Sequence, residues 1–233
     1  MIMKYPVIIM NYNLLTWPKD MVEKIKLFDD VGEIIIFDNC SNYEPLLDWY
    51  STKPCEIIHS DFNRGHCGPW DFGLINKLGS EYYVVTDPDM GLDETPKDCL
   101  NVLKNKLEQH TEFDRIGLSI IDFKYPTPDV PHFDWLNHIY YEFWDETKRE
   151  DGLLKAHIID TTFGMYNINR HKSGPSCATD YPYSVKHLPW SITNEQLNDL
   201  KNYNYEFFNY LNTAHESSSY KSYVGFNKKF NNK

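Results

Sequence analysis

The chain has 233 residues, of which 41% are hydrophobic, with a formal net charge of −11 and a pI near 5.2. This length and apolar content allow one substantial core and exclude a disordered protein. The acidic balance argues against nucleic acid or an anionic membrane surface as the main partner, because both are bound through clustered Lys and Arg.

The cysteines and the hydropathy pattern indicate the compartment. Five cysteines are odd in number and show no Cys-x-x-Cys spacing, so we expect reduced thiols and neither a zinc site nor a disulfide framework. No apolar run approaches the ~18 residues of a membrane span, and no signal peptide is evident. We therefore expect a cytoplasmic protein without an integral membrane segment, either soluble or peripherally associated with a membrane.

The first 40 residues predict one strand–helix–strand unit. Residues 6–10 form an apolar run, typical of a buried strand, that ends in Asn11-Tyr12-Asn13. A helix is predicted from Pro18, with apolar residues at i, i+4 and i+7 in Met21, Ile25 and Phe28. A second strand over residues 33–37 ends in Asp38. A unit of this size predicts neighbouring parallel strands.

The alternation continues to about residue 121. The patterns first predict a short helix with Leu46, Leu47 and Tyr50 and then a strand over residues 55–59. A helix from Gly68, with Trp70, Leu74, Ile75 and Leu78 on one face, precedes a strand over residues 82–86. A helix with Thr95 as N-cap and Leu100, Leu103 and Leu107 on its apolar face precedes a strand over residues 115–121. The fold class is therefore α/β, with an open and mostly parallel sheet flanked by helices.

The pattern changes after residue 121. Residues 122–156 are rich in proline and then in aromatic residues, and they serve either substrate contact or packing. Residues 158–166 are strand-like, and Lys186-His187-Leu188-Pro189-Trp190 follows them. A capping box over residues 193–196 predicts a last helix to about residue 212, before a loose tail.

Two carboxylates follow the strand over residues 82–86. Asp87 and Asp89 lie just past its carboxyl end, where open α/β sheets bind ligands. Oxygen ligands of this kind suit Mg²⁺ or Mn²⁺, which in turn can hold a diphosphate. The alternative is a solvated loop, because Asp-Pro favours turns.

Six blocks occur in a recognisable order: PVIIMNYN, EIIIFDNCSNYEPLLDWY, NRGHCGPWDFG, YYVVTDPDM, IDTTFGMY and KHLPW. Over residues 5–192 the chain resembles a small nucleotide-sugar glycosyltransferase of the GT-A fold, of the family 2 type found in bacteria and viruses. The resemblance implies one Rossmann-like domain. Residues 1–121 would form its nucleotide-sugar-binding half, residues 122–192 its acceptor-side half, and residues 193–233 a C-terminal helix and tail.

The resemblance also implies roles for particular residues. Asp38 matches the acid that accepts from the nucleobase, Asp89 the direct metal ligand, and His187 a second ligand that favours Mn²⁺ over Mg²⁺. A histidine that only stacks on Trp190 is the alternative for His187. Asp87 matches the acid that reaches sugar hydroxyls, metal-bound water or the metal itself. The residues that match contacts to the nucleotide-sugar donor are Asn11, Tyr12, Asn13, Asn63, Arg64, Gly65 and Asp87.

The implied reaction transfers a sugar from a nucleoside-diphosphate sugar, which we expect to be a UDP-sugar, to a hydroxyl of a glycan or small-molecule acceptor. Inversion needs a carboxylate base. The family's Glu-Asp pair is missing here, so Asp160 is the preferred base, although it could instead cap the turn at Thr161-Thr162. Asp180 is the alternative, and Asp145 with Glu146 remains open.

Two other functions stay open. A non-catalytic module that binds a sugar or nucleotide-sugar would use the aromatic segment as its platform. A nucleotidyltransferase would normally carry a Gly-rich and Lys/Arg-rich loop after the first strand, which residues 11–15 lack. A dinucleotide-dependent oxidoreductase is excluded, because no Gly-x-Gly-x-x-Gly follows any predicted strand.

Overall fold

The computed structural model describes residues 4–123, 129–131, 133, 151–154 and 163–214. The first strands and helices alternate as the periodicity predicts. Their bounds are β1 (Tyr5–Asn11), α1 (Thr16–Ile25), β2 (Val31–Asp38), α2 (Glu44–Ser51), β3 (Glu56–His59), α3 (Gly68–Asp71), β4 (Tyr82–Thr86) and α4 (Cys99–Gln109). No described helix is both long and apolar enough to cross a membrane.

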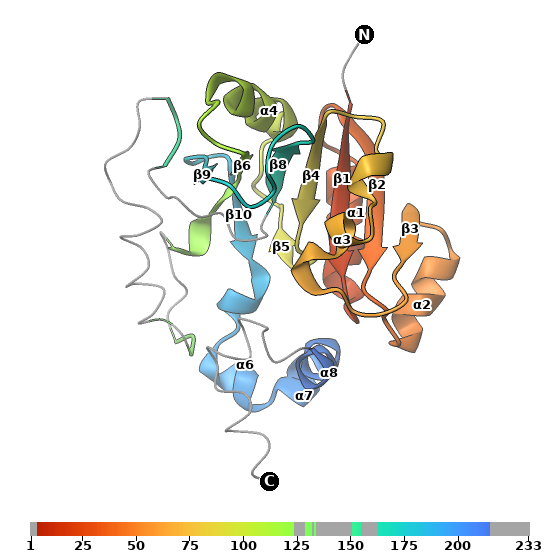
Figure 1. Ribbon diagram of the computed structural model, residues 1–233. Coiled ribbons are helices and arrows are strands. Elements are labelled where there is room, and N and C mark those ends of the chain that lie inside the picture. The colour runs from red at the N-terminus through yellow and green to blue at the C-terminus, as the bar shows by residue number, and fades with distance from the viewer. Residues whose placement is uncertain (1–3, 124–128, 132, 134–150, 155–162, 215–233) are drawn as a thin grey trace.

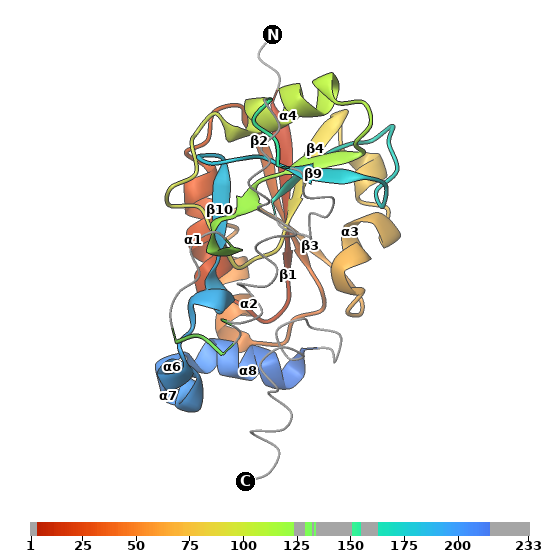
Figure 2. The ribbon, with the colours of Figure 1, turned by 90° about the vertical axis from the view of Figure 1, so that its left-hand side faces the viewer.

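Within the described residues, the main sheet has seven strands in the order β3-β2-β1-β4-β8-β6-β9. Strands β6 (Arg115–Gly117), β8 (Gly164–Asn167) and β9 (Ser176–Ala178) complete it, and only β8 runs antiparallel to its neighbours. A second sheet places β10 (Ser184–His187) between β5 (Met90–Gly91) and β7 (Ser119–Ile120). Both views show β10 running toward the C-terminal helices (Figures 1 and 2).

The core lies on both faces of the main sheet because successive strand residues point to opposite faces. Val7 and Ile9 of β1 pack under α1, α2 and α4, whereas Ile8 and Met10 face the α3 side. A strand buried on both faces reads as a continuous apolar run, which is why residues 6–10 show no alternation.

Several predicted elements differ in the structure. The helix expected from Gly68 is only α3 followed by a 3-10 turn (Ile75–Lys77), since Gly73 between them has a φ of +76°. Thr95 is not a helix cap, because its hydroxyl donates to the Ser184 carbonyl. The strand expected over residues 115–121 splits between the two sheets as β6 and β7.

The last predicted helix is three helices, α6 (Asn194–Asn198), α7 (Leu200–Tyr203) and α8 (Tyr205–Thr213). The predicted capping box at Thr193 and Gln196 is confirmed. These helices lie beyond the carboxyl ends of β1 and β2 (Figure 1). There, α8 crosses the loop after β1 and contacts it at both of its ends.

The contact between Glu206 of α8 and the start of α1 supplies the cap that α1 lacks. No side chain of its own caps α1, and the Glu206 carboxylate of α8 accepts from Leu15 N–H (2.6 Å), Thr16 N–H (2.9 Å) and the Thr16 hydroxyl (2.8 Å). We expect Glu206→Ala to lower the free energy of unfolding by about 1–2 kcal/mol, the usual cost of a lost cap and helix-terminus charge. Urea denaturation measures this loss. Glu195→Ala, an exposed acid on α6, is the matched control and should change stability little.

Candidate functional site

Four loops that carry predicted site residues lie at one edge of the main sheet. Strands β1 to β4 are parallel, so their carboxyl ends and the loops that follow them share this edge (Figure 1). The register pairs Asn11 with Asp38 and Asp38 with His59. Polar strand ends far apart in the sequence are therefore neighbours.

Asn11, the last residue of β1, and Asn13, in the loop that follows, are both buried and hydrogen-bonded. Asn11 donates through Nδ2 to the Leu14 carbonyl (2.7 Å) and to the Tyr50 hydroxyl (2.8 Å). Asn13, at a φ of +53°, accepts through Oδ1 from the N–H groups of Asn42 and Tyr43 at the start of α2. The asparagines thus hold the shape of the loop, and the partly exposed Tyr12 lies between them.

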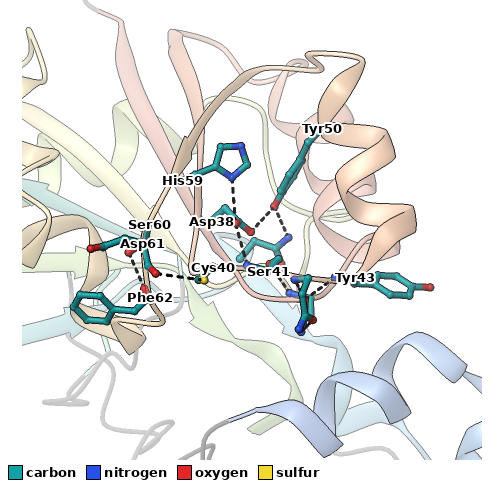
Figure 3. A network of polar contacts seen from close by, with 12 residues as sticks. Asp38, Cys40, Ser41, Tyr43, Tyr50, His59, Ser60, Asp61 and Phe62 are labelled. Carbon is teal, nitrogen blue, oxygen red and sulfur yellow. Dashed lines mark hydrogen bonds and ion pairs between the residues drawn. The ribbon is translucent and has the colours of Figure 1, made fainter.

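Asp38 belongs to a closed network and is only 1% exposed (Figure 3). Its Oδ1 accepts from the Tyr50 hydroxyl (3.3 Å), and its Oδ2 accepts from Ser41 N–H (3.1 Å) and lies 3.3 Å from His59 Nδ1. Burial, and then the charge of Asp38, raise the pKa of Tyr50. Both oxygens already have partners within the protein, and the nucleobase contact stays a prediction.

The loop after β3 is tied to the loop after β2. Asn39 donates through Nδ2 to the Gly65 carbonyl (3.2 Å) and accepts through Oδ1 from Arg64 N–H (3.2 Å). Asn63 accepts from Gly65 N–H (2.9 Å), and Gly65 has a φ of +66°. The backbone of the predicted 63–65 segment is therefore well organised.

The Arg64 side chain is held within its own loop. Its guanidinium donates to Ser60 Oγ (2.9 Å) and Asp61 (2.6 Å) and lies 4.0 Å above the Phe62 ring. Phe62 is 52% exposed, and sequence reasoning did not select it. An exposed ring backed by a guanidinium offers a stacking surface for a base or a sugar.

Asp89 and His187 meet although 98 positions separate them. The antiparallel pairing of β5 and β10 sets His187 opposite Met90, and Leu188 N–H donates to the Asp89 carbonyl (3.0 Å). His187 Nε2 lies 3.9 Å from Asp89 Oδ1, and both side chains are about 15% exposed. The imidazole also stacks on Trp190 with ring centroids 4.1 Å apart, so the two interpretations of His187 are compatible.

The donor types at this pair fit a divalent cation. A carboxylate oxygen and an imidazole nitrogen 3.9 Å apart could ligate one ion, and diphosphate oxygens and water commonly complete such a shell. Among the described residues, no group of three or more His, Cys, Asp or Glu side chains forms a metal cluster. Asp87, the other acid of the motif, is partly buried in the same loop, and its carbonyl accepts from the Thr86 hydroxyl (3.0 Å).

Sequence reasoning missed Asp122, which follows β7. This carboxylate is 4% exposed and accepts from His187 N–H (2.7 Å) and the Ser191 hydroxyl (3.3 Å). Burial raises its pKa. An acid directly after an apolar run was the available signal, the same pattern that singled out Asp38.

The candidates for the base are not brought to the Asp89–His187 pair by any described contact. Asp160, Asp145 and Glu146 lie outside the described residues. Asp180 lies in the turn before β10, where its carboxylate accepts from Tyr181 N–H (2.8 Å). His187 ends the same strand, so β10 separates Asp180 from the pair.

No protein-family model and no curated protein matches the sequence. Solved structures match the fold. A structure of GalNAc-T7 with UDP, GalNAc and Mn²⁺ is 11% identical, with 80% of this chain and 44% of that chain covered and a TM-score of 0.51. TarS from S. aureus is 11% identical, with 95% and 42% covered and a TM-score of 0.48.

A third match is glucosyl-3-phosphoglycerate synthase from Mycobacterium tuberculosis with Mn²⁺, UDP-glucose and phosphoglyceric acid. It is 9% identical, with 71% and 56% covered and a TM-score of 0.41. The chain spans less than half the length of the GalNAc-T7 and TarS chains. Identities this low show the fold alone. The chain has the α/β GT-A fold, which confirms the predicted fold class.

Proposed function

From the GT-A fold, we propose that this protein is a metal-dependent glycosyltransferase that moves a sugar from a UDP-sugar to a hydroxyl of a glycan or small-molecule acceptor. The convergence of Asp89 and His187 at the carboxyl edge of the sheet carries the proposal. Local sequence pattern does not require these residues to meet. Their meeting in the loop after β4, at the edge that the loops after β1, β2 and β3 share, is what a donor diphosphate site needs.

In this proposal each group has a defined task. Asp89 and His187 hold Mn²⁺, or Mg²⁺, which supplies positive charge against the departing diphosphate. Asp87 contacts sugar hydroxyls or the metal shell. The backbone of the loops after β1 and β3 receives the nucleoside, in a shape maintained by Asn11, Asn13 and Asn39.

The acceptor hydroxyl needs a base, for which we propose Asp160. A carboxylate that removes the proton as the hydroxyl attacks the anomeric carbon from the opposite side to the diphosphate would invert that centre. The inverting outcome therefore depends on this residue.

The test is thermal stability with UDP, GDP, CMP or dTDP, each with and without Mn²⁺. A ligand present at 100 times its dissociation constant adds about 2.7 kcal/mol to the free energy of unfolding. We expect a Mn²⁺-dependent upward shift with UDP that the other nucleotides do not match. If none of these nucleotides produces a Mn²⁺-dependent shift, the proposed donor site is wrong.

Slow hydrolysis of a UDP-sugar separates an enzyme from a binding module. We expect Mn²⁺-dependent release of UDP from at least one of UDP-glucose, UDP-galactose and their N-acetyl derivatives. Binding of UDP without any hydrolysis or transfer would favour the non-catalytic module. Release of pyrophosphate from UTP would instead favour a nucleotidyltransferase.

A further inference from the structure

Asp122 is a buried acid for which the donor site described above has no direct use. It lies in the 3-10 turn Ile121–Phe123 that follows β7, and no Lys or Arg among the described residues pairs with it. A buried carboxylate without a cation is costly unless hydrogen bonds compensate for its lost hydration. Its two hydrogen bonds therefore identify what the charge stabilises.

Both bonds go to the segment that carries His187. Strand β7 pairs in parallel with β10 through Ser119 with Ser184 and Ile120 with Val185, and this pairing ends where the chain turns at residue 121. Two positions further along, the Asp122 side chain accepts from His187 N–H at 2.7 Å. The Asp122 carboxylate thus extends the hydrogen bonding between β7 and β10 by one contact, to His187, the proposed metal ligand.

His187 is consequently held from two sides. Its own N–H is bound by Asp122, and the next N–H, of Leu188, is bound by the carbonyl of Asp89. The second oxygen of Asp122 accepts from Ser191 at the end of the turn Leu188–Ser191, which also carries Trp190 under the imidazole. One carboxylate therefore fixes both the backbone at His187 and the turn that supports its ring.

We propose that Asp122 is the positioning residue of the Asp89–His187 pair, which keeps His187 Nε2 facing Asp89 so that both can bind one divalent cation. This inference rests on the proposed function, because it assumes that the pair binds the metal. Asp122 acts through hydrogen bonds in this arrangement, because its two oxygens accept from the His187 N–H and the Ser191 hydroxyl.

The test compares three variants. Asp122→Ala removes both acceptors. Asp122→Asn can keep both contacts, with Oδ1 accepting from His187 N–H and Nδ2 donating to the Ser191 hydroxyl. Thr95→Val is the matched control, because it removes a buried bond to the carbonyl of Ser184 (2.9 Å), at the other end of β10 from His187.

Two measurements are made on each full-length protein. The first is the dissociation constant for Mn²⁺ alone and with UDP, from the electron paramagnetic resonance signal of free Mn²⁺. The second is hydrogen exchange of the His187 amide in the metal-free protein, which reports the contact with Asp122 directly. Thermal midpoints show how far each variant is destabilised.

We expect Asp122→Ala to weaken Mn²⁺ binding by about 10-fold, the lower end of losses for residues that orient a metal ligand, and to accelerate His187 exchange. Asp122→Asn should stay within about 3-fold of the wild type, since it can keep the geometry. Thr95→Val should lower the thermal midpoint and leave both readouts unchanged. If Asp122→Ala does not fold, Asp122→Leu fills the space without an acceptor and carries the same expectation.

Wild-type Mn²⁺ affinity in Asp122→Ala, or an equal loss in Thr95→Val, would overturn the inference and leave the proposed function standing. A wild-type protein that binds no Mn²⁺, with or without UDP, would overturn both the metal site and this inference. A loss in Asp122→Asn as large as in Asp122→Ala would also overturn it, because the geometry would then not be what Asp122 supplies.

Discussion

Replacement of Asp89 by alanine is expected to abolish the Mn²⁺-dependent part of UDP binding. The variant loses one of the two side chains that face each other across 3.9 Å. A lost direct ligand should cost at least about 100-fold in affinity, beyond the usual loss for residues that only support a ligand. Isothermal titration with UDP in the presence and absence of Mn²⁺ measures the effect, and His187→Ala should show the same metal-dependent loss.

The control for Asp89→Ala is Asp93→Ala. Asp93 is a nearby acid of the same charge, but its carboxylate is 72% exposed and pairs with Lys24 (2.6 Å) on α1. An exposed ion pair contributes little to stability, so this variant should bind UDP and Mn²⁺ as the wild type does. Full metal-dependent binding in Asp89→Ala would refute its role as a ligand. Equal losses in both variants would point to general electrostatics and not to coordination.

Asp160→Asn is expected to lower sugar transfer by at least ~10²-fold while UDP binding stays nearly intact. A general base contributes to the chemical step, so its loss reduces kcat more than donor affinity. The measurement is the initial rate of transfer to an accepted acceptor, together with the Kd for UDP and Mn²⁺. The anomeric configuration of the wild-type product tests inversion in the same assay.

Asp180→Asn is the matched control for the base. Asp180 lies before β10 and His187 at its end, so the structure separates this acid from the proposed metal pair. Its amide variant should retain transfer. If Asp160→Asn retained transfer as well, the role would pass to Asp145 or Glu146, whereas loss only in Asp180→Asn would reverse the assignment.

The strand ends were predictable because two local signals coincide there. A short apolar run followed by a polar residue marks both a buried strand and its end, and parallel strands end at a common edge. Asp38 and Asp89 were selected in this way, and the structure places both at the carboxyl edge of the main sheet. The burial of Asp38 was not predictable, since it depends on Tyr50 packing over it from α2.

The helices were less predictable wherever one residue interrupts a good pattern. Trp70, Leu74 and Leu78 fit one helical face, yet the left-handed backbone at Gly73 ends the helix after Asp71. Thr95 and Pro96 resemble a helix start, but the Thr95 hydroxyl binds the backbone of β10 instead. In each case a single backbone conformation or a distant partner decides the outcome, and periodicity contains neither.

The sequence by itself determined the α/β alternation, the parallel first half of the sheet and the acids at its strand ends, because these depend on periodicity within short windows. Only the tertiary structure decided that β10 lies between β5 and β7. That pairing joins His187 to Asp89 and to Asp122, which lie 98 and 65 positions away. Backbone hydrogen bonds between strands are the same for any residue, so local pattern does not specify which distant strands pair.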